Sequence, residues 1–148
     1  MERSLKKHLK NGKFQKVSPV RSRTMSRIRG KNNKSTEIQF RMSLIRNKIV
    51  GWTTNEVTLI GKPDFYFKKV KLAIFIDGCF WHGCPICGHI PQTNTSFWKE
   101  KIKRNKLRDK RTNKALLKQG IKVLRLWEHQ IKNSKVINLT LKTILKLL

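Results

Sequence analysis

The sequence predicts an α/β domain in which helices cover the faces of a mixed β-sheet. Two observations predict this class. Helix-like and strand-like segments follow one another in the order helix, three strands, helix, strand, helix, and the segment Leu72–Ile76 is apolar throughout. An unbroken apolar run of this length is typical of a central strand buried on both faces. Because the chain has 148 residues, we expect one such domain, over residues 35–148.

The first helix is expected from residue 35 or 36 to about Asn47. Ser35 or Thr36 can cap its N-terminus with a side-chain oxygen. Three apolar side chains recur at i, i+4 and i+7 and define the face expected to be buried: Ile38, Met42 and Ile45.

Three strands are expected next. Trp52–Ile60 lies between two glycines, Phe65–Phe67 follows a Lys-Pro-Asp turn, and Leu72–Ile76 is the central strand. Residues 78–91 are rich in glycine and proline and are interpreted as a loop.

A long helix, a strand and a closing helix complete the domain. Thr95 or Ser96 is expected to cap the long helix, and Gly120 to end it. The strand is expected over Ile121–Trp127, and the closing helix over Lys135–Leu147.

The charge of the chain points to a polyanionic partner. Its 35 lysines and arginines face 8 acids, a net charge of +27. Residues 1–36 hold 12 basic residues and residues 99–118 hold 10, so we expect a flexible basic arm over 1–34 and a basic helix. Two such runs favour phosphate binding over ordinary solvated faces. A nucleic-acid partner is therefore expected.

The same composition excludes other classes of protein. The longest apolar run has five residues, whereas a membrane span needs about 20. No secretory leader is visible, and three cysteines within nine residues do not suit a disulfide framework. We expect a reduced compartment, the cytoplasm.

Acidic residues are scarce, so their positions are informative. Asp64 precedes one strand and Asp77 ends the next, which brings the two carboxylates toward one edge of a hairpin; Glu37 begins the first helix. Each also suits a plain structural role in a turn or at a helix N-terminus. Together they predict a site for Mg²⁺, a cation that takes oxygen ligands. His82 follows in the loop and could accept a proton from water.

The cysteines predict a second metal site. Cys79, Cys84 and Cys87 have the spacing C-x4-C-x2-C, and three thiolates need one more ligand to close a tetrahedral Zn²⁺ site. His89 and His129 are both candidates, and the spacing does not decide between them.

Aromatic side chains lie beside the cysteines and at the start of the basic helix. Phe80 and Trp81 are in the loop, and Trp98 opens the helix. Such rings either anchor a loop by packing or insert between bases of nucleic acid.

A family resemblance links these features. The run D-G-C-F-W-H-G-C-P at 77–85 resembles the signature of very-short-patch-repair endonucleases, which nick DNA at T:G mismatches. Further similar segments follow in the family's order, over roughly residues 22–132: G-K-P-D-F at 61–65, N-T-S-F-W at 94–98, N-K-L-R-D at 105–109 and W-E-H at 127–129. The resemblance implies a restriction-endonuclease-like fold with an added structural zinc.

The resemblance also implies a role for each matching residue. Asp64 and the backbone oxygen of Ile76 would bind Mg²⁺, Glu37 would hold the waters of the metal, and His82 would activate water. The zinc ligands would be Cys79, Cys84, Cys87 and His129. The DNA-inserting residues would be Phe80, Trp81 and Trp98 from the major groove and Met25 from the minor groove.

Two departures from the pattern of restriction nucleases stand out. Ile76-Asp77-Gly78 replaces the usual E-x-K, so no lysine is present. Asp77 also stands where some relatives have histidine, and it could either bind metal or orient His82.

The sequence thus predicts a Mg²⁺-dependent endonuclease that nicks 5′ to the T of a T:G mismatch in very short patch repair. We expect a monomer on double-stranded DNA, with a cytosine methylase and downstream repair proteins as further partners. Basic residues of the arm and helix would hold phosphates: Arg27, Arg29, Lys101 and Arg108. The alternatives are a restriction-linked nuclease of matched DNA and a non-catalytic, zinc-stabilised DNA-binding protein.

Overall fold

The computed structural model describes residues 3–11, 14, 20 and 36–148. Its helices and strands follow one another along the chain in an α/β order. They are α1 (Arg3–Lys6), α3 (Glu37–Arg46), β1 (Trp52–Thr54), β2 (Phe65–Phe67), β3 (Leu72–Asp77), α4 (Thr95–Lys118), β4 (Lys122–Trp127), α5 (Glu128–Ile131) and α6 (Ser134–Leu147).

The four strands form one mixed sheet in the order β1-β2-β3-β4. The first three are antiparallel neighbours, with Phe65 opposite Ile74 between β2 and β3. β4 pairs with β3 in parallel, Leu72 opposite Lys122, because α4 carries the chain back along the sheet before β4 begins. The expectation that β3 is a central, buried strand is confirmed.

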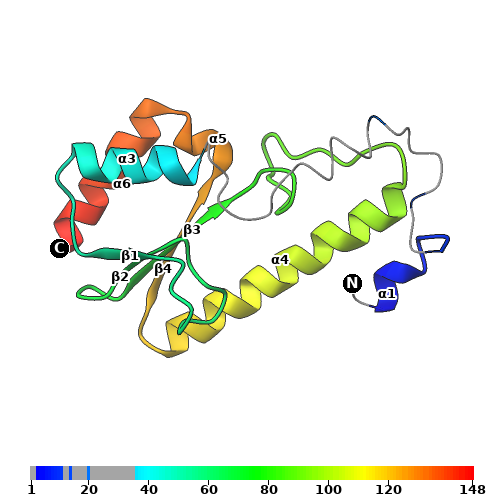
Figure 1. The fold of residues 1–148 in the computed structure, drawn as a ribbon, viewed down its shortest axis with the longest axis horizontal. Coiled ribbons are helices and arrows are strands. Elements are labelled where there is room, and N and C mark those ends of the chain that lie inside the picture. Colours follow the sequence, from blue (N-terminus) through cyan, green and yellow to red (C-terminus); the bar gives the residue numbers. More distant parts are fainter. Residues whose placement is uncertain (1–2, 12–13, 15–19, 21–35) are drawn as a thin grey trace.

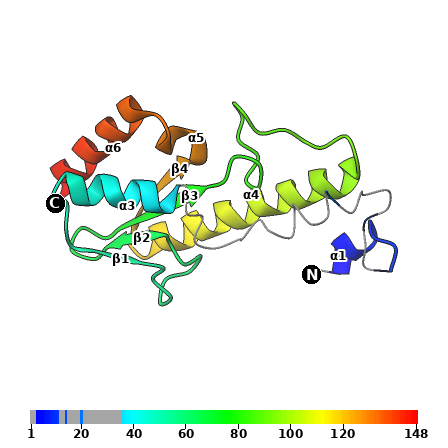
Figure 2. The same cartoon turned by 45° about the horizontal axis from the view of Figure 1, so that its top comes forward.

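Helices cover both faces of the sheet (Figures 1 and 2). On one face α3 and α6 pack on the strands around a core that contains Phe40, Phe65 and Leu141. On the other face α4 packs through Leu116 on Ala73 and Phe75 of β3. The result is the predicted mixed sheet flanked by helices, consistent with a restriction-endonuclease-like fold.

The N-terminal half of α4 extends beyond the sheet, where it carries the loop after β3 and lies near α1 (Figure 1). The helix begins one residue earlier than a Thr95 cap predicts and two residues earlier than a Ser96 cap predicts. Its N-cap is Asn94, in the left-handed region with φ 54°. The Thr95 hydroxyl instead donates to the backbone oxygens of Pro91 and Gln92 and closes the preceding turn. Gly120 follows the C-terminus with φ +70°, as expected.

Two expectations for the first half of the domain are wrong. The face of α3 that we expected to be buried is outside: Ile38, Met42 and Ile45 are 44%, 40% and 52% exposed. Phe40 and Leu44, also one turn apart, are fully buried instead. The larger Phe40 ring packs on Phe65 at 5.1 Å, and this contact selects the buried face.

The first strand is also shorter than Trp52–Ile60. It stops at Thr54 because its partner β2 has only three residues, after which Asn55 turns with φ 52°. Glu56 then accepts a hydrogen bond from the Thr58 hydroxyl at 2.7 Å, which stabilises a turn rather than a strand. The short helix α5 was not expected at all.

Candidate nuclease and metal sites

The carboxylates predicted from the sequence lie where β2 begins and β3 ends. Asp64 precedes β2, and its Oδ2 accepts the backbone N–H of Ile76 at 2.6 Å. The side chain of Asp64 is therefore fixed beside the end of β3, as predicted from the expected hairpin of β2 and β3. Glu37, the first residue of α3, is close enough for its charge to act on Asp64.

Asp64 is the most perturbed acid of this group. Burial raises its pKa, the Ile76 N–H lowers it, and the charges of Glu37 and Asp77 raise it further; the result is about 6 against an ordinary 3.8. Arg125 lowers the pKa slightly. A partly buried carboxylate that is destabilised by two neighbouring acids is a place where a cation would be stabilising.

Asp77 is already paired. Both of its carboxylate oxygens lie 2.8 Å from Nη1 of Arg125 on β4, and the residue is 5% exposed. Its Oδ1 is 3.6 Å from Nδ1 of His82. Of the two roles that the sequence left open for Asp77, this geometry favours orientation of neighbours over metal binding.

His82 is held by an acid that sequence reasoning did not select. Its Nδ1 lies 2.6 Å from Oδ2 of Asp109 on α4. Although burial raises the pKa of Asp109, the hydrogen bond with His82, the charge of His82 and the nearby Arg125 hold it below its ordinary value. When Nδ1 carries the proton for this bond, Nε2 is left with its lone pair as a proton acceptor.

One face of α4 supplies a row of polar groups to the site. Asn105 Nδ2 donates to the Trp81 backbone oxygen at 2.7 Å, and Asn113 Oδ1 accepts from Arg125 Nε at 3.0 Å. Together with Asp109 they are spaced four residues apart, so they line one stripe of the helix. This spacing was a readable signal, and Arg125, a charge within an apolar strand pattern, was another.

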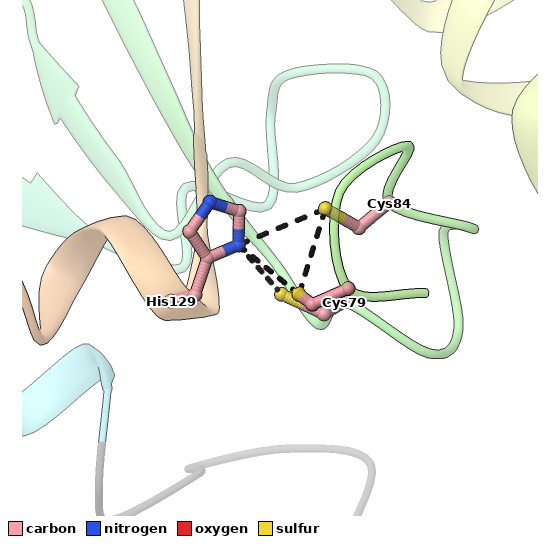
Figure 3. A group of neighbouring side chains, drawn as sticks. Cys79, Cys84 and His129 are labelled. Atoms are coloured by element: carbon pink, nitrogen blue, oxygen red, sulfur yellow. Dashed lines mark hydrogen bonds between the residues drawn. The ribbon is translucent and has the colours of Figure 1, made fainter. Parts of the chain in front are cut away.

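The three cysteines and His129 come together in space (Figure 3). The Nδ1 atom of His129 lies 3.2, 3.7 and 3.3 Å from the sulfurs of Cys79, Cys84 and Cys87. His89 instead lies against the ring of Phe80. Among the described residues this is a group of four with one ligand atom each, all within 4.8 Å of one another.

The spacing of these four atoms fits zinc. Tetrahedral bonds of about 2.3 Å to sulfur and about 2.0 Å to nitrogen place sulfurs about 3.8 Å apart, and sulfur and nitrogen about 3.5 Å apart. The sulfurs of Cys84 and Cys87 are 3.7 Å apart. The hydrogen bond with Cys79 raises the pKa of Cys87 most; desolvation, the hydrogen bond with Cys84 and repulsion by the charges of these two sulfurs add to it, and the result is about 12. A divalent cation would relieve that repulsion.

The loop that carries His82 and the cysteines is tightly folded against α4. Backbone N–H groups of His82 and Cys84 donate to the oxygens of Gly78 and Cys79 at 3.1 and 2.8 Å. Gly83 has φ +63°, and a Cβ there would stand 2.6 Å from side-chain carbons of Ile102 and Lys106. Glycine lets the loop approach the helix and keeps His82 over Asp109.

The predicted aromatic residues form one cluster beside this loop. The Phe80 ring lies 5.0 Å from Trp81 and 5.1 Å from Trp98, and the two tryptophans are 5.9 Å apart. The ring of Phe14 also stacks on Trp98, with the ring centroids 5.8 Å apart. All three predicted rings are partly exposed, so they pack on each other and still present aromatic surface.

The basic residues chosen from the sequence lie in two places. Arg108 of α4 has a 63% exposed side chain, and Lys101 is partly buried on the same helix. The predicted arm residues lie outside the described part of the chain: Met25, Arg27 and Arg29. Near the arm's start, Leu5 is 1% exposed and His8 Nε2 lies 2.8 Å from Glu100 on α4, so α1 is docked on that helix.

Comparison with known proteins identifies the family. The family model for the DNA mismatch endonuclease Vsr matches residues 13–87. A type II nicking enzyme of Xanthomonas oryzae pv. oryzae, V.XorIIP, is 32% identical over 133 residues, which cover 88% of this chain and 96% of that protein. The chain belongs to the Vsr family of DNA endonucleases. The resemblance to very-short-patch-repair endonucleases that the sequence shows is thereby confirmed.

Other Vsr relatives are similar over shorter regions. The DNA mismatch endonuclease Vsr of Escherichia coli (strain K12) is 36% identical over 112 residues, 74% of this chain and 69% of that protein. The type II nicking enzyme V.NaeI of Lentzea aerocolonigenes is 51% identical over 69 residues, 47% of this chain. The matches span 42% of V.NaeI and 59% of V.NmeAIP of Neisseria meningitidis, so the chain aligns with about half of each.

No helix in the described ranges is long and apolar enough to cross a bilayer.

Proposed function

We propose that this chain nicks one strand of double-stranded DNA, 5′ to the T of a T:G mismatch, in very short patch repair. The observation that carries the proposal is the pairing of His82 with Asp109, next to the end of β3 where Asp64 is held, beside a cluster of partly exposed aromatic rings. A hydrolytic centre and a surface suited to base stacking thus share one edge of a strongly basic molecule. Membership of the Vsr family supports the same activity.

The hydrolytic step follows from the contacts of His82. With Nδ1 bonded to Asp109 at 2.6 Å, Nε2 can take a proton from a water molecule. The water oxygen then attacks the phosphorus, and the P–O bond opposite breaks. The leaving sugar oxygen takes a proton from solvent, which leaves a hydroxyl and a phosphate at the cut. Asp109 keeps the imidazole in the required tautomer and stabilises its protonated form.

A divalent cation fits the carboxylates at this edge. Asp64 and Glu37 have oxygen ligands to offer, and the Ile76 backbone lies against Asp64. Burial, together with the charges of Glu37 and Asp77, raises the pKa of Asp64, so a cation beside it would be stabilising. Asp77 is left out of the set because Arg125 occupies both of its oxygens. When bound, Mg²⁺ supplies stabilisation of the charge that develops on the phosphate. Zn²⁺ in the Cys₃His group would have a structural role.

Mismatch selectivity would come from the aromatic cluster. Insertion of Phe80, Trp81 and Trp98 between bases costs a few kcal/mol of unstacking per step. A T:G pair is easier to distort than a matched pair, so the cost is lower at a mismatch. Met25 would insert from the minor-groove side, and basic residues of the arm and helix would contact phosphates: Arg27, Arg29, Lys101 and Arg108.

Labelled duplexes test this proposal. Purified protein is incubated with Mg²⁺ and end-labelled T:G or T:A duplexes, beside Asp64→Asn and His82→Ala. We expect a single nick in the T strand of the T:G duplex, with rates at least about 100-fold lower for both variants. Cutting of both duplexes equally would refute mismatch selectivity. Binding without cutting across several flanking sequences would refute the nuclease.

A second candidate is a nicking enzyme linked to restriction and modification. Relatives such as V.XorIIP and V.NmeAIP are named type II nicking enzymes, which favours a link of this kind. Preference for a matched duplex would support it. For the mismatch enzyme, we propose a cytosine methylase and downstream repair proteins as partners, a monomeric state and a location in the bacterial cytoplasm with the DNA.

A further inference from the structure

Arg125 of β4 joins groups from three elements around the proposed hydrolytic centre. Its Nη1 lies 2.8 Å from both oxygens of Asp77 on β3, and its Nη2 lies 3.4 Å from Oδ1 of Asp109 on α4. Its Nε donates to Asn113 at 3.0 Å. The guanidinium also lies over the ring of Phe75, 4.6 Å from its centroid. All these donors belong to one rigid plane, so the contacts fix β3, β4 and α4 relative to one another.

The contact with Asp109 matters because of what the other oxygen of that carboxylate does. Oδ1 faces Arg125, while Oδ2 meets His82 Nδ1 at 2.6 Å. A carboxylate held at one oxygen by a fixed cation has little freedom to rotate about its side chain. The contact with Arg125 on β4 therefore fixes the direction in which Asp109 presents Oδ2 to His82.

The contact with Asp77 removes a competing acid. Asp77 Oδ1 is 3.6 Å from the same His82 nitrogen, and Asp77 is 5% exposed. Without Arg125, its buried charge would have no strong partner and could draw the imidazole away from Asp109. Leaving a buried charge unpaired is strongly destabilising. Arg125 thus neutralises the charge of Asp77 and orients the carboxylate of Asp109.

We propose that Arg125 is a positioning residue that acts through Asp109 to fix the orientation and tautomer of His82. This inference rests on the proposed nicking function for its kinetic test. The family assignment gives Arg125 no role, and sequence reasoning placed it on an ordinary strand.

Four variants test the proposal: Arg125→Met, Arg125→Lys, the double variant Asp77→Asn/Arg125→Met, and Lys122→Met. Lys122 is exposed on the same strand and serves as a matched control. For Arg125→Met we expect kcat to fall by about 10²-fold with KM changed by less than about threefold, because orientation rather than DNA binding is lost. Arg125→Lys should regain part of kcat, and Lys122→Met should equal the wild type.

The double variant separates positioning from stability. It removes the unpaired buried carboxylate, so its thermal stability should exceed that of Arg125→Met while kcat remains low. Recovery of kcat together with stability would show a purely structural role and overturn the proposal. Unchanged kcat in Arg125→Met would overturn it as well.

A spectroscopic measurement tests the inference without any nicking activity. In ¹⁵N-edited spectra of the full chain, the His82 ring should be a single Nδ1–H tautomer in the wild type and in Lys122→Met. In Arg125→Met it should become a mixture of tautomers. A wild type that does not nick would refute the proposed function, and the spectra would still decide the role of Arg125. A pure Nδ1–H tautomer in Arg125→Met would overturn that role.

Discussion

Replacement of Asp64 by asparagine is expected to stabilise the folded chain near pH 8 while it removes nicking. The carboxylate is partly buried, accepts one backbone N–H and lies near Glu37 and Asp77. Its pKa is about 6 in the folded chain against an ordinary 3.8. At about 1.36 kcal/mol per pH unit, ionisation of Asp64 costs the folded state about 3 kcal/mol more than the unfolded state. Asparagine carries no charge and avoids this cost.

The pH dependence follows from the sign of this shift. Because the folded pKa is the higher one, protonation of Asp64 stabilises the wild type fully below pH 3.8, and this stabilisation is lost as the pH rises through about 6. The advantage of Asp64→Asn is therefore largest above pH 6 and vanishes toward pH 4. Nicking by the wild type should fall below pH 6 for the same reason, because a protonated Asp64 is a poor metal ligand.

Thermal and urea unfolding from pH 4 to pH 8, in buffer without added divalent cation, measure this difference. Addition of Mg²⁺ should then raise the melting temperature of the wild type and leave Asp64→Asn unchanged. Glu56→Gln is a control of opposite sign, since hydrogen bonds from Thr58 lower the pKa of Glu56 and favour its charge. The reasoning is refuted if Asp64→Asn is no more stable than the wild type at pH 8, or if the difference does not shrink with falling pH.

Three further outcomes are expected. Cys84→Ser should lower bound zinc well below one ion per chain, measured by metal analysis, and should unfold the loop after β3, seen as faster proteolysis; zinc bound at full stoichiometry would contradict the site. Trp98→Ala should weaken binding of a T:G duplex more than of a T:A duplex, by about 1–3 kcal/mol in a titration, because base stacking on the ring is lost. Leu44→Ala should lower the free energy of unfolding by about 2–5 kcal/mol, whereas the exposed Met42→Ala should change it by less than about 0.5 kcal/mol; equal effects would contradict the orientation of α3.

Local sequence signals determined most of the fold. β3 was predictable because a short unbroken apolar run is typical of a strand buried on both faces. The end of α4 was predictable because glycine readily adopts the positive φ that Gly120 has there. The orientation of α3 was not predictable, because the helix has two apolar stripes and only contact with Phe65 shows which one is inside. The length of β1 was also not predictable from the sequence, since it depends on a partner strand of three residues.

The candidate sites divide in the same way. The sequence by itself determined the basic charge, the three cysteine positions and the pairing of Asp64 with the end of β3, because residue chemistry and near-neighbour spacing carry this information. Spacing left His89 and His129 open and the family resemblance implied His129, which the tertiary structure brings to the cysteines from 42 to 50 residues away along the chain. Only the tertiary structure decided that Asp77 faces Arg125 and that His82 faces Asp109. These partners are brought together by the parallel pairing of β3 with β4 and by the packing of α4 on the sheet. Neither of these contacts can be read from the spacing of residues along the chain.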